Sequence, residues 1–322
     1  MLGAFLAVLS AASFAATAAA GRRGVVTGTP TQGMVLSNLV GVLCFLVVAA
    51  LTGEITRTMQ FPPTTAAWMA GGGVLQFVVG RYANFRANQS AGVNLTAPVV
   101  QLNVVVTLVL AVIFLGEPCT VLQLIGGLVM FAGAFTTQQQ SLPKVGAPEF
   151  SPRYAEAYLF ALVAALAYGT GPFMARIALQ LSDLLSAISG GLISYGASTT
   201  AVATMILLSP SLRRNVTSVK CESIRWFAYS GVAVAAAHGF MYAALAVAPI
   251  MIVIPLLQLT LVFRLFFSAW ANPHHEIFGV KVVLGTVISM VGACAVAVDT
   301  DFILAALRVP YTLGQVLRLS VS

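Results

Sequence analysis

The sequence predicts an all-α integral membrane protein with ten transmembrane helices, arranged as two inverted repeats of five helices each. Three observations predict this fold. The chain is 59% hydrophobic and only 8% charged, with a mean hydropathy of +0.95, whereas a soluble domain carries about 25% charged residues. Its apolar residues fall in windows of about twenty, the length that crosses the hydrocarbon core as a helix. Short sequences also recur in the two halves at a fixed spacing.

The apolar windows divide evenly about one polar segment that is rich in Pro and Gln. The windows of the first half are residues 2–20, 33–52, 66–85, 91–115 and 121–136. The windows of the second half are residues 158–175, 184–208, 226–245, 248–270 and 277–298. We therefore divide the chain into a first repeat (1–138), a linker (139–157), a second repeat (158–298) and a C-terminal tail (299–322). Pro310 interrupts the tail, so we expect an interfacial segment there and no further span.

The first window ends in three alanines at residues 18–20, which resembles the cleavage site of a signal peptide. No basic residue precedes this window, and Arg22 and Arg23 follow it. That flank is typical of a retained membrane helix. We therefore expect residues 2–20 to be the first span.

The two halves repeat each other locally. The segment PVVQLN at residues 98–103 matches PLLQLT at residues 255–260, 157 positions later. A pair of glycines seven apart, Gly126 and Gly133, recurs 159 positions later as Gly285 and Gly292. Because each half has an odd number of windows, the two copies must cross the membrane in opposite directions. Inverted repeats of this kind place the substrate site of many secondary transporters near the midplane.

A short motif after the fourth window resembles a known family. LGEP at residues 115–118 precedes QLIGG at residues 123–127 and then Gly133, and Pro98 and Pro255 lie in the fourth window of each half. These features resemble the EamA-type permeases of the drug/metabolite transporter superfamily, although the second half has PHHE at residues 273–276 in place of the Gly-Glu pair. The resemblance implies alternating access through a central cavity lined by the first four helices of each half. It also implies that the fifth and tenth helices pack at the periphery or in a homodimer contact.

Two prolines with nearby amides form the first group of candidate site residues. Pro98 and Pro255 remove a backbone donor within an apolar window, which kinks a helix, and we expect them to act as hinges. One turn later in each window come Gln101 and Gln258, followed by Asn103 and Thr260. Polar side chains in hydrocarbon must face protein or water, so we expect these four to bind substrate. Hydrogen bonds between helices are the alternative for the two Gln side chains.

A second group of candidates contains the positive charges. Arg81, Tyr82 and Asn84 lie late in the third window, and His238 lies 157 positions after Arg81 in the eighth. We expect these side chains to hold a carboxylate or phosphate of the substrate. Arg86 and Arg264 have the alternative of reaching the lipid headgroups, and His238 has the alternative of a packing role.

All nine acidic residues map to connections or helix ends, and none lies well inside a window. A transporter that exchanges protons for lipophilic cations needs a carboxylate buried in the membrane. A neutral, zwitterionic or anionic metabolite is therefore the expected substrate.

Several other functions find no support. The chain has no phosphate-binding loop of the Gly-rich Lys-Ser/Thr type, so we expect no ATP-driven transport. Ser194 and Ser198 near His238 match no catalytic motif, so we expect no enzyme. The adjacent His274, His275 and Glu276 lack the spacing of metal ligands, and we expect no cofactor. The net charge of +7 lies between the windows, where it meets lipid headgroups and not nucleic acid.

The expected protein is a secondary transporter or facilitator of amino-acid-like or organic-acid metabolites in a plasma membrane such as the bacterial inner membrane. Its expected partners are the substrate, membrane lipids and a second copy of the chain. A multidrug or cation exporter and a non-transporting receptor are the alternatives. The orientation stays open, because the positive charges gather on the face opposite the termini while the resemblance places the termini in the cytoplasm.

Overall fold

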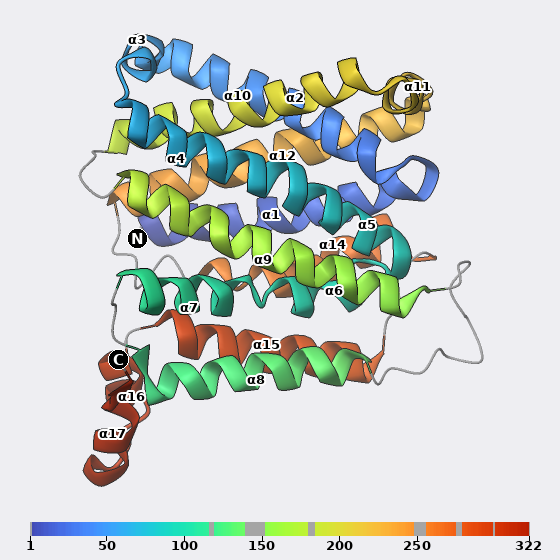
Figure 1. The fold of residues 1–322 in the computed structure, drawn as a ribbon. Helices are drawn as coiled ribbons and strands as arrows, with labels where there is room; N and C mark the ends of the chain where they lie inside the picture. The colour runs from blue at the N-terminus through green and yellow to red at the C-terminus, as the bar shows by residue number, and fades with distance from the viewer. Residues whose placement is uncertain are drawn as a thin grey trace.

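The computed structural model describes residues 2–115, 119–138, 152–179, 184–247, 256–274, 279–298 and 300–321, and these form a bundle of helices (Figure 1). The first half contains α1 (Leu2–Thr27), α2 (Pro30–Thr52), α3 (Glu54–Met59), α4 (Pro63–Val74), the π-helix η1 (Leu75–Gly80), α5 (Arg81–Ala91), α6 (Val93–Val100), α7 (Asn103–Leu115), β1 (Cys119–Thr120) and α8 (Val121–Gln138). The second half contains α9 (Tyr154–Leu179), α10 (Leu184–Leu208), α11 (Pro210–Thr217), α12 (Cys221–Val247), α14 (Thr260–Ala271) and α15 (Val280–Ala297). The tail contains α16 (Thr300–Ala306), α17 (Tyr311–Arg318) and β2 (Ser320–Val321).

Each of the ten apolar windows overlaps a helix of the described residues. Two windows of the first half are interrupted, because the third divides into α4, η1 and α5 and the fourth into α6 and α7. The first helix is longer than predicted and carries Arg22 and Arg23 inside it. Arg22 is only 3% exposed within this helix, and its side chain donates to the backbone carbonyl oxygens of Asn88 and Gln89.

Among the described residues, five helical segments are long and apolar enough to cross a membrane: Leu2–Thr27, Pro30–Thr52, Val93–Phe114, Tyr154–Ala175 and Ile188–Leu208. A sixth appears if Val280–Ala295 and Thr300–Ala306, which are bent by 115° relative to each other, count as one span. Leu43, Val47 and Leu51 form an exposed apolar stripe along α2 at four-residue spacing. Such a stripe faces lipid, and the chain is a multi-pass membrane protein.

The helices pack in a pattern that pairs one half with the other. Helix α1 lies against α12 and α14, while α9 lies against α5, α6 and α7. Helix α2 contacts α10, and α8 lies beside α15 along one edge of the bundle (Figure 1). Both chain termini lie at the same end. The tail folds back at this edge, where β2 pairs antiparallel with β1 and α17 contacts α8.

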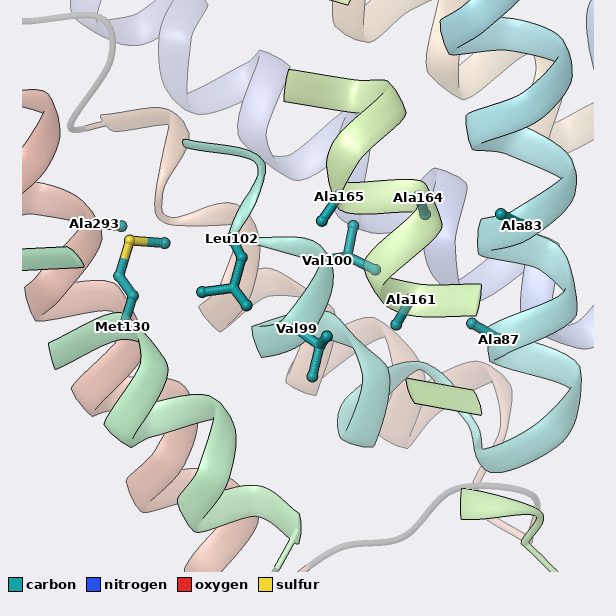
Figure 2. Close-up of a cluster of buried hydrophobic side chains, with 10 residues drawn as sticks. All are labelled: Ala83, Ala87, Val99, Val100, Leu102, Met130, Ala161, Ala164, Ala165 and Ala293. Atoms are coloured by element: carbon teal, nitrogen blue, oxygen red, sulfur yellow. The ribbon is translucent and has the colours of Figure 1, made fainter. Parts of the chain in front are cut away.

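Small side chains allow this close packing. Figure 2 shows one buried cluster in which alanines of α9 and α5 and the valines of α6 meet, while Met130 of α8 points to Ala293 of α15. A second close approach needs glycine for its backbone conformation. Gly92 joins α5 to α6 at a φ of 84°, which other residues rarely adopt, so the chain reverses without a loop.

The two ends of the bundle differ in charge. The end where α11 lies (Figure 1) carries most of the positive charges of the described residues, in α11 and in or beside the adjoining ends of α1, α5, α9, α12 and α15: Arg22, Arg23, Arg86, Arg153, Arg213, Arg214, Lys220, Arg225 and Lys281. The opposite end, which carries α3 and the tail, has Arg57, Arg308 and Arg318. We call these the basic end and the α3 end.

The contact between α8 and α15 generates a first prediction. A methyl group at Gly133 would lie 2.5 Å from the Ser289 backbone nitrogen and 2.6 Å from the Gly285 carbonyl oxygen. Neither backbone atom can move unless the helices separate, so Gly133→Ala should lower the free energy of unfolding by about 1–3 kcal/mol. The measurement is thermal unfolding of the purified protein in detergent. Gly196→Ala in α10, where no atom lies within 4 Å of the added methyl, is the matched control. Equal melting temperatures for the two variants would contradict the close contact.

Candidate functional site

The π-helix η1 positions the central side chains of the site. It follows three glycines, of which Gly73 packs directly on α10, since an added Cβ would lie 2.6 Å from the Ser194 Cα. Asn38 of α2 donates from its Nδ2 to the Phe77 carbonyl oxygen at 2.8 Å and so holds η1 against α2. Single π-turns within α-helices often occur at functional sites. Here the π-turn places Phe77 and Arg81 between α2, α10 and α12.

The Arg81 guanidinium is buried in this contact, with only 5% of the residue exposed. Its Nη1 donates to the Ser37 hydroxyl at 3.3 Å, and its Nη2 donates to the Tyr195 hydroxyl at 3.4 Å. Its Cζ lies 5.1 Å from the centre of the Phe77 ring and 5.8 Å from that of Tyr195. Among the described residues, no carboxylate forms an ion pair with it. Within the described part of the chain, the positive charge is therefore stabilised by long hydrogen bonds and aromatic faces.

Aromatic rings enclose this charge. Tyr195 is 1% exposed and stacks on Phe77, with ring centres 4.1 Å apart, and on Phe45 at 5.1 Å. His238 of α12 is also buried, and its ring meets Phe77 edge-on at 5.5 Å. The His238 Nδ1 lies 2.8 Å from the Val234 carbonyl oxygen. Because a carbonyl oxygen only accepts, Nδ1 carries the proton. This environment agrees with the packing alternative for His238. The His238 ring and the Arg81 guanidinium both contact the Phe77 ring.

The two amides predicted from the repeat meet in the interior. Gln101 and Gln258 are both buried, and the Gln101 Nε2 donates to the Gln258 Oε1. Each lies at a break in its helix where a backbone hydrogen bond spans three residues and not four. Leu102 N–H donates to the Val99 oxygen, and Leu259 N–H donates to the Leu256 oxygen, so both breaks use bonds to the third preceding residue. The same local structure thus recurs 157 residues apart.

A tyrosine and a second arginine extend the polar region. The Tyr168 ring of α9 packs on Gly80, where an added Cβ would lie 2.8 Å from its Cε1. The Arg264 Nε is fully buried and has no hydrogen-bond partner among the described residues. Protein therefore covers this nitrogen of the Arg264 guanidinium, while the residue as a whole is partly exposed.

A small cavity opens beside the Arg81 cluster. Its volume is ≈ 20 Å³, about the space that one water molecule needs. Phe77 and Tyr195 form its wall on the Arg81 side, Gln76 and Ser194 add polar groups, and glycines of α4, α9 and α10 line the rest.

The remaining candidates lie elsewhere. Tyr82 packs edge-on against Phe160 in an apolar cluster, on another face of the helix from Arg81. The Thr260 hydroxyl donates to the Leu257 carbonyl oxygen of its own turn. Asn103 begins α7, and its backbone oxygen contacts α9 at Gly169. Of the two predicted hinges, Pro98 is buried inside α6, and Pro255 lies outside the described residues.

The acidic residues of the described chain are Glu54, Glu156, Glu222 and Asp301, and all lie in first turns or short helices near the ends of the bundle. Glu54 is nevertheless buried, because its Oε2 accepts from the Ser189 hydroxyl at 3.0 Å. Glu117, Glu149, Asp183, Glu276 and Asp299 lie outside the described residues. Within the described chain no cluster of His, Cys, Asp and Glu has the arrangement of a metal site.

Sequence reasoning missed Phe77, Tyr195 and Tyr168. Each lies in an apolar window in which an aromatic residue has no distinguishing pattern. The two serines considered for catalysis, Ser194 and Ser198, donate to the backbone oxygens of Met69 and Tyr195.

The aromatic stack yields a second prediction. Tyr195→Phe keeps both ring contacts and loses one long hydrogen bond, so the loss of stability should be at most about 1.5 kcal/mol. Tyr195→Ala removes a fully buried ring and should cost about 3–5 kcal/mol. Thermal unfolding of both variants in detergent measures the difference. A Phe variant as unstable as the Ala variant would show that the hydroxyl, and not the stack, holds the helices together.

Comparison with known proteins agrees with this architecture. The family model of EamA-like transporters matches residues 1–138. Eighteen chains of solved structures match the fold. One, described only as a crystal structure of a protein, has a TM-score of 0.60 and 16% identity over 95% of this chain and 99% of that chain. At that identity the likeness shows the fold alone. No curated protein matches the sequence. Residues 1–138 therefore carry the sequence signature of the EamA-like transporter family, which confirms the resemblance to the drug/metabolite transporters and points to a membrane transporter of small molecules.

Proposed function

We propose that the protein is a secondary transporter or facilitator that moves small carboxylate-bearing metabolites, such as amino acids or organic acids, across a plasma membrane by alternating access. The observation that carries this proposal is the buried Arg81 guanidinium, which lies between helices of both halves and pairs with no carboxylate of the described residues. A substrate carboxylate would supply the missing negative charge. A hydrogen bond between two charged groups is about twice as strong as one between neutral groups.

The packing of the helices supports an inverted repeat with ten spans. In the repeat, α1 corresponds to α9, α2 to α10, α5 to part of α12, and α8 to α15. The α1–α12 contact therefore has its counterpart in the α9–α5 contact, while the α2–α10 and α8–α15 contacts each join two corresponding helices. Two contacts lie where a twofold axis would pass: Gln101 with Gln258, and the Ser289 hydroxyl with the Met130 oxygen, the latter pair 159 residues apart. Five spans in each half would cross in opposite directions, as alternating access requires.

The charges of the site favour an anionic group over a cation. Arg81 and Arg264 are both positive, and the described acidic residues lie near the ends of the bundle. A cation entering this region would be repelled and would also lose its hydration, at a cost of several kcal/mol in hydrocarbon. The multidrug and cation-exporter alternative is therefore the weaker one.

Polar contacts close the basic end of the bundle in this structure. The Glu156 carboxylate of α9 forms two ion pairs. Its Oε1 lies 2.5 Å from Arg86 Nη2 of α5, and its Oε2 lies 2.9 Å from Arg153 Nη1. Arg22 of α1 binds the end of α5 through two carbonyl oxygens. The arrangement corresponds to a transporter state that is closed at the basic end, and transport requires these contacts to break.

Replacing the central charge tests the proposal. Arg81→Gln should raise the substrate concentration for half-maximal uptake of the transported acid by at least about tenfold, because a hydrogen bond to a charged group contributes roughly 1.5–3 kcal/mol. Uptake is measured in proteoliposomes with a panel of amino acids, organic acids and quaternary ammonium compounds, with and without a pH gradient. Arg225→Gln, at an exposed position of α12, is the control and should transport normally. Normal transport by Arg81→Gln, or preferential transport of quaternary ammonium compounds by the unmodified protein, would contradict the proposal.

The closed end gives a separate test. Glu156→Gln leaves Arg86 and Arg153 unpaired and should open the basic end more often. The reporter is Ser90→Cys, a 2% exposed position at the end of α5, in a background whose native cysteines are replaced by serine. Maleimide labelling of this introduced thiol should become several-fold faster in Glu156→Gln. Glu222→Gln breaks the looser Arg23–Glu222 pair, 3.6 Å apart, and should leave the rate unchanged. Equal labelling in all three proteins would show that the network does not control this end.

A further inference from the structure

We propose that the C-terminal tail is a lipid-binding hairpin. It lies in the headgroup region of the bilayer at the α3 end and buries the apolar face of α17 among the acyl chains. Its partner is the surface of a phospholipid bilayer. The structure adds a folded shape, an attachment point and an apolar face to the interfacial segment that the sequence predicted, and the proposal does not depend on which substrate the protein transports.

The tail runs across the direction of the spanning helices. Val280–Ala295 of α15 and Thr300–Ala306 of α16 are bent by 115° relative to each other, so α16 does not continue the path of α15. Figure 1 shows α16 and α17 beside the start of α8, at the level where the long helices end. The headgroups of a bilayer lie at the ends of its spanning helices. The tail is therefore placed to lie along the membrane surface.

Both ends of the tail are attached to the start of α8. The Thr300 hydroxyl forms a hydrogen bond with the Thr120 hydroxyl at 2.6 Å. At the other end, β2 pairs with β1, and the Val121 N–H donates to the Leu319 carbonyl oxygen at 3.0 Å. Residues 301–318 thus form a loop whose two ends meet at one point of the bundle. This attachment keeps the loop at the membrane surface.

The two helices of the tail pack against each other. The Arg318 Nε lies 2.5 Å from the Asp301 Oδ1. Leu304 is buried at the contact with Gly314, where an added Cβ would lie 3.9 Å from the Leu304 Cδ1. A segment that is already folded loses less conformational entropy when it binds. The hairpin therefore meets lipid as an ordered surface.

Helix α17 is amphipathic. Its positions 313, 316 and 317 are apolar and lie on one side of the helix, because they are three and four residues apart. The Gln315 Nε2 donates to the Tyr311 hydroxyl at 2.9 Å on the other side, where Arg318 follows. Large apolar side chains of the hairpin are more than half exposed: Phe302, Leu307, Leu313, Val316 and Leu319.

The exposed groups of the hairpin match a lipid surface. Burying a Leu or Val side chain away from water contributes about 1.5–3 kcal/mol, which acyl chains can supply as well as protein can. Arg308 is exposed at the turn between the two helices, where it can reach lipid phosphates while the apolar face is immersed. An apolar face combined with basic residues is typical of helices that lie in the membrane interface.

The experiment places a fluorophore on each face of α17 in the full-length protein. The variants are Leu313→Cys and Val316→Cys on the apolar face and Gln315→Cys on the polar face, in a background whose native cysteines are replaced by serine. Each thiol is labelled with bimane, and the protein is reconstituted in vesicles of phosphatidylcholine and phosphatidylglycerol. One set of vesicles contains phosphatidylcholine brominated in the upper part of an acyl chain, and a second set is exposed to aqueous iodide.

The brominated lipid should quench the labels at positions 313 and 316 at least about twofold more strongly than the label at 315, because only the apolar face is immersed. Iodide should quench in the opposite order. Equal quenching of the two faces by either reagent would overturn the proposal, since the hairpin would then have no lipid-facing side. Protection of positions 313 and 316 from both quenchers would also overturn it, because protein, such as a second copy of the chain, would then cover the apolar face.

Discussion

A positive charge buried within a membrane protein must be compensated, and the need to compensate Arg81 shapes the centre of this bundle. An ionised side chain at the centre of the bilayer costs about 2.5–3.5 kcal/mol even on the mildest scale. The chain offsets part of that cost with the hydroxyls of Ser37 and Tyr195 and the faces of two aromatic rings. Because these groups come from α2, η1 and α10, holding the charge also holds helices of both halves together.

The same constraint explains the unusual local structures nearby. The π-turn of η1 turns Phe77 and Arg81 toward α10, and Asn38 ties the Phe77 carbonyl to α2. Glycines occur where a ring or a backbone must approach closely, as at Gly80 beneath Tyr168 and at Gly73 against α10. The breaks at Gln101 and Gln258 then join the two halves through one amide pair. The close packing, the polar contacts and the helix breaks all lie at the interface between the halves.

Much of this organisation could be predicted from the sequence. The apolar windows predicted where the helices lie, because length and hydropathy alone identify a segment that can cross the membrane as a helix. The repeated Pro and Gln residues predicted that Gln101 and Gln258 occupy matching places, and the structure brings them into contact. Arg81 and His238 were paired by the same spacing, and both contact Phe77. Their roles in substrate binding stay predictions.

Other features could not be predicted, for physical reasons. The aromatic partners Phe77, Tyr168 and Tyr195 lie in windows whose apolar residues surround the helix, so periodicity does not separate a ring that faces a charge from one that faces lipid. The sequence left open whether Arg264 reaches the headgroups, because a sequence does not show which face of a helix turns inward. The π-turn depends on tertiary contacts such as that of Asn38, which link residues far apart in the chain. The pairing of β1 with β2 likewise joins residues 119–120 to residues 320–321.

The central claim is that the Arg81 guanidinium meets the transported anion, and arginine modification measures this directly. The purified protein is treated with phenylglyoxal with and without a transported carboxylate, and mass spectrometry follows modification at each arginine. The account predicts that the substrate slows modification of Arg81 by at least several-fold and does not affect the exposed Arg225. Modification of Arg81 at the same rate with and without substrate would contradict the account. So would a complete lack of modification at Arg81 under both conditions, because Arg81 would then be a sealed structural residue that no solute reaches.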